Sequence, residues 1–152
     1  MTHDLLIHGG RLILRDGDKE ADLSIRAGKV AAIGKDLDVP ADCPRLDASG
    51  HWVFPGLIDP QVHFREPGQP HKETLASGAR AAVAGGVTSF LDMPNNVPAA
   101  TSLEAMRTKL DAAARTSVAH HGFFIGVTPD NPASRQEAVG TPDSPTSRPG
   151  IC

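Results

Sequence analysis

Three polar residues at alternate positions, Gln61, His63 and Arg65, are the first candidates for chemistry in this chain. They stand in the segment 55–68, whose aliphatic residues and flanking Pro-Gly pairs predict a buried strand. Because side chains alternate along a strand, the three polar groups are expected on one face, where burial without partners is costly. An imidazole is a common metal ligand, and a guanidinium binds carboxylates. The other interpretation is a hydrogen-bonded core histidine beside an arginine at the strand end.

Helix and strand patterns alternate in the residues that follow. Residues 72–85 carry aliphatic residues at helical spacing and end in a Gly-Gly stop, and residues 87–93 predict a second buried strand. A capping box formed by Thr101 and Glu104 predicts the start of a second helix, and residues 120–127 predict a third strand. This alternation indicates an α/β fold in which helices cover a parallel sheet.

Functional residues in such sheets collect where the strands end. Three polar residues, His63, Arg65 and Asn95, fall at the predicted carboxyl ends of the first two strands. Asn95 belongs to the loop 94–98, whose two prolines end the second strand. The sequence therefore predicts a site at this edge of the sheet.

Five short motifs in this region resemble those of the cyclic amidohydrolases, and most closely those of dihydroorotase. In chain order they are Pro-Gly-Leu-Ile-Asp (55–59), His-Phe-Arg-Glu-Pro-Gly (63–68), His-Lys-Glu-Thr (71–74), Ala-Gly-Gly-Val-Thr (84–88) and Met-Pro-Asn (93–95). The His-Lys-Glu piece favours dihydroorotase over the alternatives, hydantoinase and allantoinase. The resemblance extends from residue 1 to about residue 131.

The resemblance implies a (β/α)8 barrel that carries a small β-sandwich. It implies reversible hydrolysis of a cyclic amide, between dihydroorotate and carbamoyl aspartate, in pyrimidine biosynthesis. It also implies one or two zinc ions, which would activate water and polarise the amide carbonyl. By position, His63 would be the second histidine of a metal-binding His-x-His pair, and Gln61 takes the place of the first. Arg65 and Asn95 would hold the carboxylate of the substrate.

Gln61 departs from this pattern, because a neutral amide oxygen suits calcium or magnesium better than zinc. In one interpretation the enzyme works with one metal held by other ligands, and in another it belongs to a branch that accepts glutamine here. In the third, the protein resembles the non-catalytic dihydroorotase homologues that scaffold aspartate transcarbamoylase. Retention of Arg65 and Asn95 favours a substrate-binding site.

Residues 1–54 have a separate pattern and match, by the same resemblance, the N-terminal half of the β-sandwich. Short strands are predicted at 5–8, 11–14, 21–26 and 29–33, and turns at Asp16-Gly17-Asp18, Ala27-Gly28 and Ser49-Gly50. The remaining histidines are interpreted as structural, loop or surface residues rather than metal ligands: His3, His8, His51, His71, His120 and His121.

Composition indicates a soluble, cytoplasmic protein. The net charge of −3 gives no electrostatic case for binding nucleic acid or a membrane. No apolar run reaches the ~20 residues of a membrane span. Residues 4–15 are expected to form a hairpin rather than the apolar core of a signal peptide. The two cysteines, Cys43 and Cys152, indicate neither a disulfide framework nor a zinc motif.

Length and the final residues suggest an incomplete fold. A (β/α)8 barrel needs about 250 residues, whereas this chain has 152. Residues 132–152 are rich in proline and polar residues, which predicts a disordered or out-of-frame tail. The expected organisation is thus a sandwich part (1–54), the first three or so strands of a barrel (55–131) and this tail. We assign no catalytic residue and expect the isolated chain to be marginally stable, prone to aggregation and inactive. The full-length parent is expected to bind a small cyclic amide and to form a homo-oligomer or a complex with aspartate transcarbamoylase.

Overall fold

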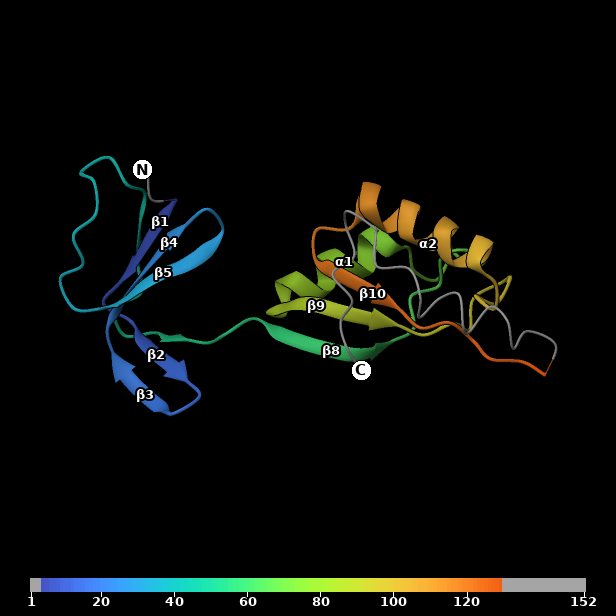
Figure 1. Ribbon diagram of the computed structural model, residues 1–152, viewed down its shortest axis with the longest axis horizontal. Coiled ribbons are helices and arrows are strands. Elements are labelled where there is room, and N and C mark those ends of the chain that lie inside the picture. Colours follow the sequence, from blue (N-terminus) through green and yellow to red (C-terminus); the bar gives the residue numbers. More distant parts are fainter. Residues whose placement is uncertain (1–3, 130–152) are drawn as a thin grey trace. The chain divides into compact units, whose positions relative to one another are not determined.

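A computed structural model describes residues 4–129 of the chain. The predicted tail at 132–152, together with His3 and Cys152, lies outside the described residues. The chain divides into two compact units, with the boundary along the sequence between Pro55 and Gly56 (Figure 1). We call them the N-terminal unit (residues 4–55) and the βα unit (residues 56–129) and describe each by itself.

The N-terminal unit contains two sheets. Its strands are β1 (Leu5–His8), β2 (Arg11–Leu14), β3 (Gly17–Glu20), β4 (Asp22–Arg26), β5 (Lys29–Gly34), β6 (Arg45–Asp47) and β7 (Trp52–Val53). One sheet has the order β5-β4-β1-β6 and the other has the order β3-β2-β7. The predicted strands at 5–8, 11–14, 21–26 and 29–33 are therefore confirmed, with small changes in their bounds.

One connection of this unit is explained by its turn residues, and two others differ from the sequence prediction. Ala27 and Gly28 both have positive φ, 51° and 68°, as a two-residue turn between antiparallel strands requires. The expected hairpin over residues 4–15 is wrong, because β1 and β2 belong to different sheets. The expected turn at Asp16-Gly17-Asp18 is also displaced, since Gly17 already belongs to β3. The sequence did not reveal β3 because its four residues, Gly-Asp-Lys-Glu, are all exposed and are poor strand formers.

The βα unit is a three-stranded parallel sheet with both helices on one face (Figure 1). Its elements are β8 (Leu57–Val62), α1 (Leu75–Ala84), β9 (Val87–Asp92), α2 (Leu103–Thr116) and β10 (His120–Phe123). The sheet order is β10-β9-β8, and both pairs of neighbouring strands are parallel. The predicted alternation of strands and helices is confirmed. No helix among residues 4–129 is long and apolar enough to cross a membrane.

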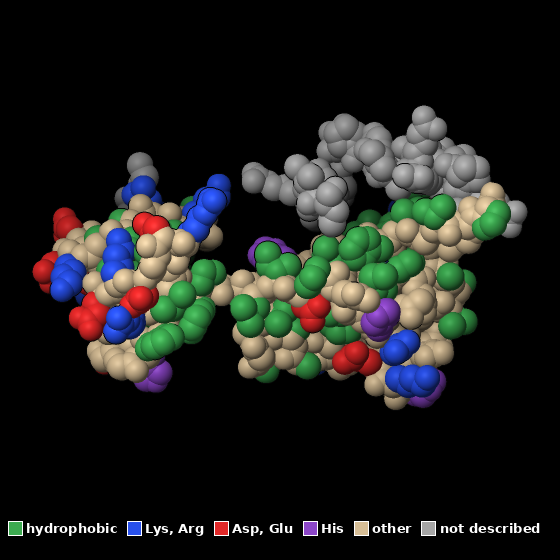
Figure 2. All heavy atoms as spheres, turned by 90° about the horizontal axis from the view of Figure 1, so that it is seen from below, with side chains coloured by type: hydrophobic (Ala, Val, Ile, Leu, Met, Phe, Trp, Pro, Cys, Tyr) green, Lys and Arg blue, Asp and Glu red, His purple; other side chains and the backbone are tan. Residues whose placement is uncertain are grey.

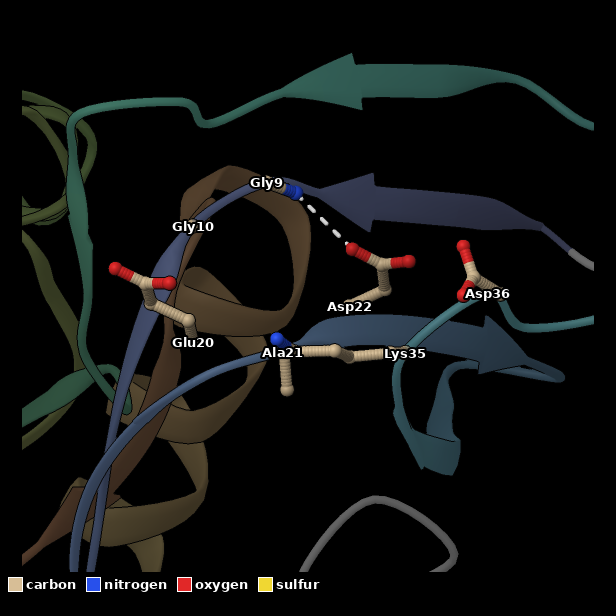
Figure 3. Close-up of a pocket in the computed structure, with 7 residues that line it drawn as sticks. All are labelled: Gly9, Gly10, Glu20, Ala21, Asp22, Lys35 and Asp36. Atoms are coloured by element: carbon tan, nitrogen blue, oxygen red, sulfur yellow. Dashed lines mark hydrogen bonds between the residues drawn. The ribbon is translucent and has the colours of Figure 1, made fainter.

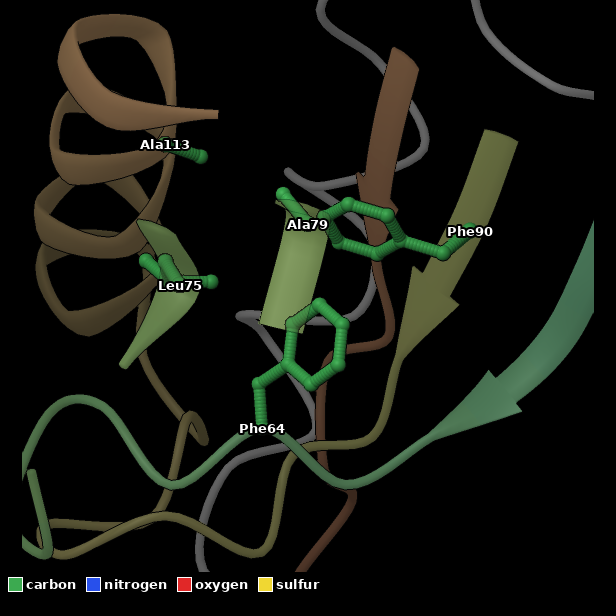
Figure 4. Close-up of a cluster of buried hydrophobic side chains, with 5 residues drawn as sticks. All are labelled: Phe64, Leu75, Ala79, Phe90 and Ala113. Atoms are coloured by element: carbon green, nitrogen blue, oxygen red, sulfur yellow. The ribbon is translucent and has the colours of Figure 1, made fainter. Parts of the chain in front are cut away.

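The core of the βα unit lies between the helices and the sheet. It consists of five buried side chains, which Figure 4 shows: Phe64, Leu75, Ala79, Phe90 and Ala113. The rings of Phe64 and Phe90 meet edge to face, with centroids 4.8 Å apart. Phe64 therefore holds the loop after β8 against α1 and β9.

Two helix starts differ from the sequence prediction. Helix α1 begins at Leu75 rather than at residue 72, because Thr74 is its N-cap and exchanges capping-box hydrogen bonds with Ser77. Helix α2 is capped by Ser102, whose hydroxyl accepts from the backbone N–H of Ala105. The predicted capping box of Thr101 and Glu104 is therefore wrong by one residue.

Strand β8 is an edge strand, and the prediction that it is buried is wrong. Within residues 4–129 it pairs only with β9, and Leu57 and Ile58 are 54% and 67% exposed. Figure 2 shows hydrophobic side chains spread over one face of the βα unit. Side chains of this size are normally covered in a folded sheet. The apolar residues of this strand are therefore suited to burial, but residues 4–129 do not cover them.

Candidate functional site

The candidate residues after β8 lie in a loop rather than on a strand. Strand β8 ends at Val62, and its register with β9 breaks between Asp59 and Val62. The backbone N–H of Gln61 donates instead to Asp59 Oδ1 at 3.0 Å. The expectation that Gln61, His63 and Arg65 alternate onto one strand face is therefore wrong, because the pairing that would enforce alternation ends first.

The structure brings His63 and Asn95 together although they are 32 positions apart. His63 Nδ1 lies 3.0 Å from Asn95 Oδ1, and both side chains are exposed. An amide oxygen can only accept, so Nδ1 carries the proton and donates it. In a neutral imidazole the other nitrogen, Nε2, then keeps its lone pair and can accept a proton or bind a metal. Asn95 still has its amide N–H groups available for a further acceptor.

Arg65 lies in the same loop and is partly buried. Its backbone carbonyl accepts from the N–H of Gln69 at 2.8 Å. Within residues 4–129 no ion pair or hydrogen bond engages its guanidinium. A guanidinium binds carboxylates through two parallel hydrogen bonds, so Arg65 can serve an anionic ligand. Its predicted role in substrate binding stays a prediction.

The described residues do not make a zinc site on their own. Across residues 4–129, no group of three or more His, Cys, Asp or Glu side chains could hold a metal ion. A zinc ion needs at least three protein ligands, and His63 offers one imidazole nitrogen. Gln61 is exposed and adds only a neutral amide. We therefore derive no reaction step through a metal from this chain.

Sequence reasoning missed a buried polar network behind the site. Asp92, Asn96 and Lys109 are 0%, 8% and 1% exposed. Lys109 Nζ lies 2.7 Å from Asp92 Oδ2, 2.6 Å from Asn96 Oδ1 and 3.2 Å from the carbonyl oxygen of Met93. It also stands 4.7 Å from the centroid of the Phe123 ring. Lys109 shares one helix face with Met106 and Ala113, and a lysine on such an apolar stripe is the signal that could have revealed the network.

Burial acts on both charges of this network. Desolvation raises the pKa of Asp92, although hydrogen bonding and attraction to Lys109 oppose the rise. Desolvation likewise lowers the pKa of Lys109, against the same attraction. The network is thus held together in spite of the cost of burying its charges.

A separate hollow on the N-terminal unit contains none of the candidate residues. Figure 3 shows the residues that line it: Gly9, Gly10, Glu20, Ala21, Asp22, Lys35 and Asp36. One carboxylate that lines the hollow is hydrogen-bonded, because Asp22 Oδ1 accepts from the N–H of Gly9 at 3.0 Å. Residues 4–129 bring together no metal-ligating group there either.

A parallel sheet covered by helices, with polar side chains in the loops that follow its strands, is the architecture of an α/β enzyme whose site lies at the strand ends. Residues 52–147 match the Amidohydrolase family, and the chain belongs to that family.

Individual relatives carry three different names. The chain is 40% identical to the allantoinase of Deinococcus radiodurans over 132 residues, which cover 86% of this chain and 29% of the relative. It is 50% identical to the dihydroorotase of Anaeromyxobacter dehalogenans over 100 residues, which cover 64% of this chain and 23% of the relative. The L-hydantoinase structure from Arthrobacter aurescens superposes with a TM-score of 0.85 at 30% identity, over 91% of this chain and 31% of that one. The chain thus spans less than a third of these relatives, and the comparisons do not single out dihydroorotase.

Proposed function

We propose that this chain supplies one wall of the active site of a cyclic-amide hydrolase. The observation that carries the proposal is the 3.0 Å hydrogen bond between His63 and Asn95. Arg65 follows His63 by two residues, and within residues 4–129 no ion pair or hydrogen bond engages its guanidinium. In this arrangement, His63 Nε2 faces the reacting group, and the Asn95 amide and Arg65 bind the substrate. The family membership supports the reaction class, and the similarity to allantoinase, dihydroorotase and hydantoinase supports a cyclic amide as substrate.

The proposal includes the larger fold. We take β8, β9 and β10 to be the first strands of a (β/α)8 barrel, and the N-terminal unit to be part of its accompanying β-sandwich. The similarity to the L-hydantoinase structure over 91% of this chain supports this assignment. In the parent enzyme we expect zinc, with His63 as the ligand that this chain contributes and the other ligands provided by later barrel strands. The chain alone is then expected to bind substrate weakly and to lack hydrolytic activity.

Within the family, we propose a cyclic amide that carries a carboxylate, such as dihydroorotate, as the substrate. A guanidinium and an amide N–H that face the same ligand are complementary to a carboxylate. Neither hydantoin nor allantoin has this group, so Arg65 and Asn95 support dihydroorotate over these two candidates.

Binding of matched ligands to the chain tests this proposal. Dihydrouracil is the same ring as dihydroorotate without the carboxylate. In two-dimensional NMR titrations, dihydroorotate is expected to shift the signals of Arg65 and Asn95, and dihydrouracil is expected to shift them several-fold less. Arg65→Gln should abolish the difference, whereas Arg107→Gln, at an exposed position of α2, should preserve it. Equal responses to the two ligands would exclude a carboxylate-bearing substrate.

Gln61 favours a second candidate function. It stands where the resemblance leads us to expect a histidine, so one metal ligand is missing from the chain itself. A non-catalytic homologue that scaffolds aspartate transcarbamoylase accounts for this substitution. That function predicts no selective response to dihydroorotate, and binding of purified aspartate transcarbamoylase by the chain would support it.

A further inference from the structure

The buried network of Asp92, Asn96 and Lys109 makes its hydrogen bonds to the loops that carry the candidate site. Asp92 Oδ1 accepts from the backbone N–H of Phe64 at 3.0 Å. Asn96 Nδ2 donates to the carbonyl of Phe64 at 3.1 Å and to the carbonyl of Glu66 at 3.0 Å. Both backbone polar groups of the residue between His63 and Arg65 are therefore fixed by this network.

The same network fixes the second loop. Lys109 Nζ has three N–H groups and three oxygen partners, on Asp92, Met93 and Asn96. Two of these partners, Met93 and Asn96, flank the short stretch that contains Asn95. The side chains of Asp92 and Asn96 thus join the loop after β8 to β9 and the loop that follows it. The Lys109 ammonium group, which extends from α2, contacts both of these side chains.

The chemistry of the network points to positioning rather than to stability. A buried ion pair is on average no more stabilising than apolar side chains of similar volume. What it adds is directed contacts. Within residues 4–129 the hydrogen bonds of the three side chains, together with the ion pair of Lys109 and Asp92, reach only positions 64, 66, 92, 93 and 96. Two backbone hydrogen bonds, from Met93 N–H to Val62 and from Val97 N–H to Pro67, also join the two loops. The network adds the contacts nearest to His63 and Asn95. Catalytic and binding side chains depend on such supporting contacts for their geometry.

We propose that Asp92, Asn96 and Lys109 are positioning residues for the candidate site. They hold the two loops so that His63 Nδ1 donates to Asn95 Oδ1 and His63 Nε2 keeps its lone pair. This inference rests on the proposed function, in which His63 and Asn95 belong to one active-site wall.

The tautomer of His63 tests the proposal without an activity assay. Long-range ¹H–¹⁵N spectra distinguish protonated from unprotonated ring nitrogens. They would be recorded near pH 8.5, about two units above the ordinary imidazole pKa of ~6.5. Wild-type protein is expected to show His63 with the proton on Nδ1. Asn95→Ala provides the reference spectrum of a His63 without its acceptor.

Two variants disconnect the network in different ways. Asp92→Asn with Lys109→Met removes both charges together, and Asn96→Asp keeps the oxygen that Lys109 contacts but removes the N–H donor to Phe64 and Glu66. In folded variants, the spectrum of His63 is expected to move to that of Asn95→Ala, with loss of the Nδ1-protonated form. Arg107→Met, which removes an exposed cation from the same helix, should leave it unchanged.

Each outcome decides the proposal. If either variant folds and His63 keeps the wild-type tautomer, the network does not position the site. If both variants unfold the βα unit, while signals of the N-terminal unit persist, the network is a stability element and the proposal fails. The ligand titration is a separate test, since it can fail while the tautomer of His63 still depends on the network.

Discussion

At the scale of single residues, the contact between His63 and Asn95 determines what both side chains can still do. Because Nδ1 donates to Asn95 Oδ1 at 3.0 Å, the free lone pair of His63 is on Nε2. Asn95 in turn uses its oxygen on the histidine and retains its N–H groups for a ligand. A residue that the resemblance assigns to the substrate therefore also orients a candidate metal ligand, because a hydrogen bond at one ring nitrogen of a histidine fixes the ring and its tautomer.

Gln61→His tests how much the glutamine at position 61 lowers the zinc affinity of the chain. The substitution restores a His-x-His pair with His63, and two imidazoles bind zinc more tightly than one imidazole and one amide. We expect the zinc affinity of the chain to rise about tenfold or more, a change of at least ~1.4 kcal/mol, measured by calorimetric titration. Gln69→His, in the loop after β8, is the control and should change the affinity little. An unchanged affinity for Gln61→His would show that residues 61 and 63 cannot face a common ion.

Lys109→Met tests the buried ion pair. Alone, it leaves Asp92 as a buried charge without a partner, and we expect the βα unit to lose about 3–5 kcal/mol of stability. Adding Asp92→Asn should recover most of this loss. Urea unfolding, followed through the NMR signals of β9, measures both variants. Equal losses for the single and double variants would mean that the two residues are not coupled.

The stability difference between wild type and the double variant should also depend on pH. Burial raises the pKa of Asp92, so its contribution is fully present below its ordinary value of 3.8 and is lost as pH rises through the raised folded value. Burial lowers the pKa of Lys109, so its contribution is present above 10.5 and is lost as pH falls through the lowered folded value. The stability of the wild type relative to the double variant should therefore be lowest between these two transitions, around neutral pH. A maximum there would contradict this prediction.

Sequence reasoning predicted the candidate site residues but not the buried network that supports their loops. His63, Arg65 and Asn95 were recognisable because their motifs are local and resemble those of a known family. No local motif marks the role of Lys109, because its partners belong to β9 and to the loop that follows β9. Lysine on a helix is usually solvated, so composition alone favoured an exposed position.

At the scale of elements, helix α1 and the loop after β8 are fitted to each other through Gly78. A Cβ atom at this position would lie 2.5 Å from the ring of Phe64, which is itself buried against Phe90. The Glu66 carboxylate accepts from the N–H of Leu75 at 2.9 Å and ties the loop to the first turn of the helix. The close approach of helix and loop therefore requires glycine in the middle of α1.

Gly78→Ala is expected to destabilise the βα unit, although alanine is the better helix former. Propensity alone would stabilise the helix by about 0.8–1 kcal/mol, but the new methyl group must displace the Phe64 ring, at a typical cost of about 1–3 kcal/mol. Ala81→Gly, at an exposed position of the same helix, serves as the control and should cost about 1 kcal/mol through propensity alone. A stabilising effect of Gly78→Ala would show that Phe64 moves aside without cost.

Periodicity predicted the order of elements well and their ends less well. The strand-helix-strand order followed from spacing, because buried faces recur every two or every 3.6 residues. The helix starts depended on single hydroxyl groups, and Thr101 and Ser102 are chemically similar candidates for one cap. Strand β3 has no apolar face, so no pattern in the sequence could reveal it. The length of β8 was set by its pairing with β9, which is not visible in the local sequence.

At the scale of the whole molecule, residues 4–129 leave both edge strands of the βα sheet, β8 and β10, and several apolar side chains uncovered. Of the two, β8 carries the more exposed apolar side chain, Ile58, which is 67% exposed. Val118 and Val127 are also exposed, at 60% and 63%. An unpaired edge with apolar side chains favours pairing with another chain. We therefore expect the aggregation predicted from the sequence to begin at β8.

Ile58→Lys is expected to reduce self-association of the chain, because a charge on an edge strand opposes pairing with a second copy. Light scattering as a function of concentration would measure the effect, and we expect a clear shift toward monomer. Val30→Lys provides the matched control, since Val30 is 58% exposed on β5, at the edge of a sheet in the N-terminal unit. If Val30→Lys reduces association as much as Ile58→Lys does, the effect is one of net charge rather than of β8. If neither variant changes association, the exposed edge of β8 is not where copies of this chain meet, and the uncovered apolar side chains elsewhere in the βα unit become the surface to test.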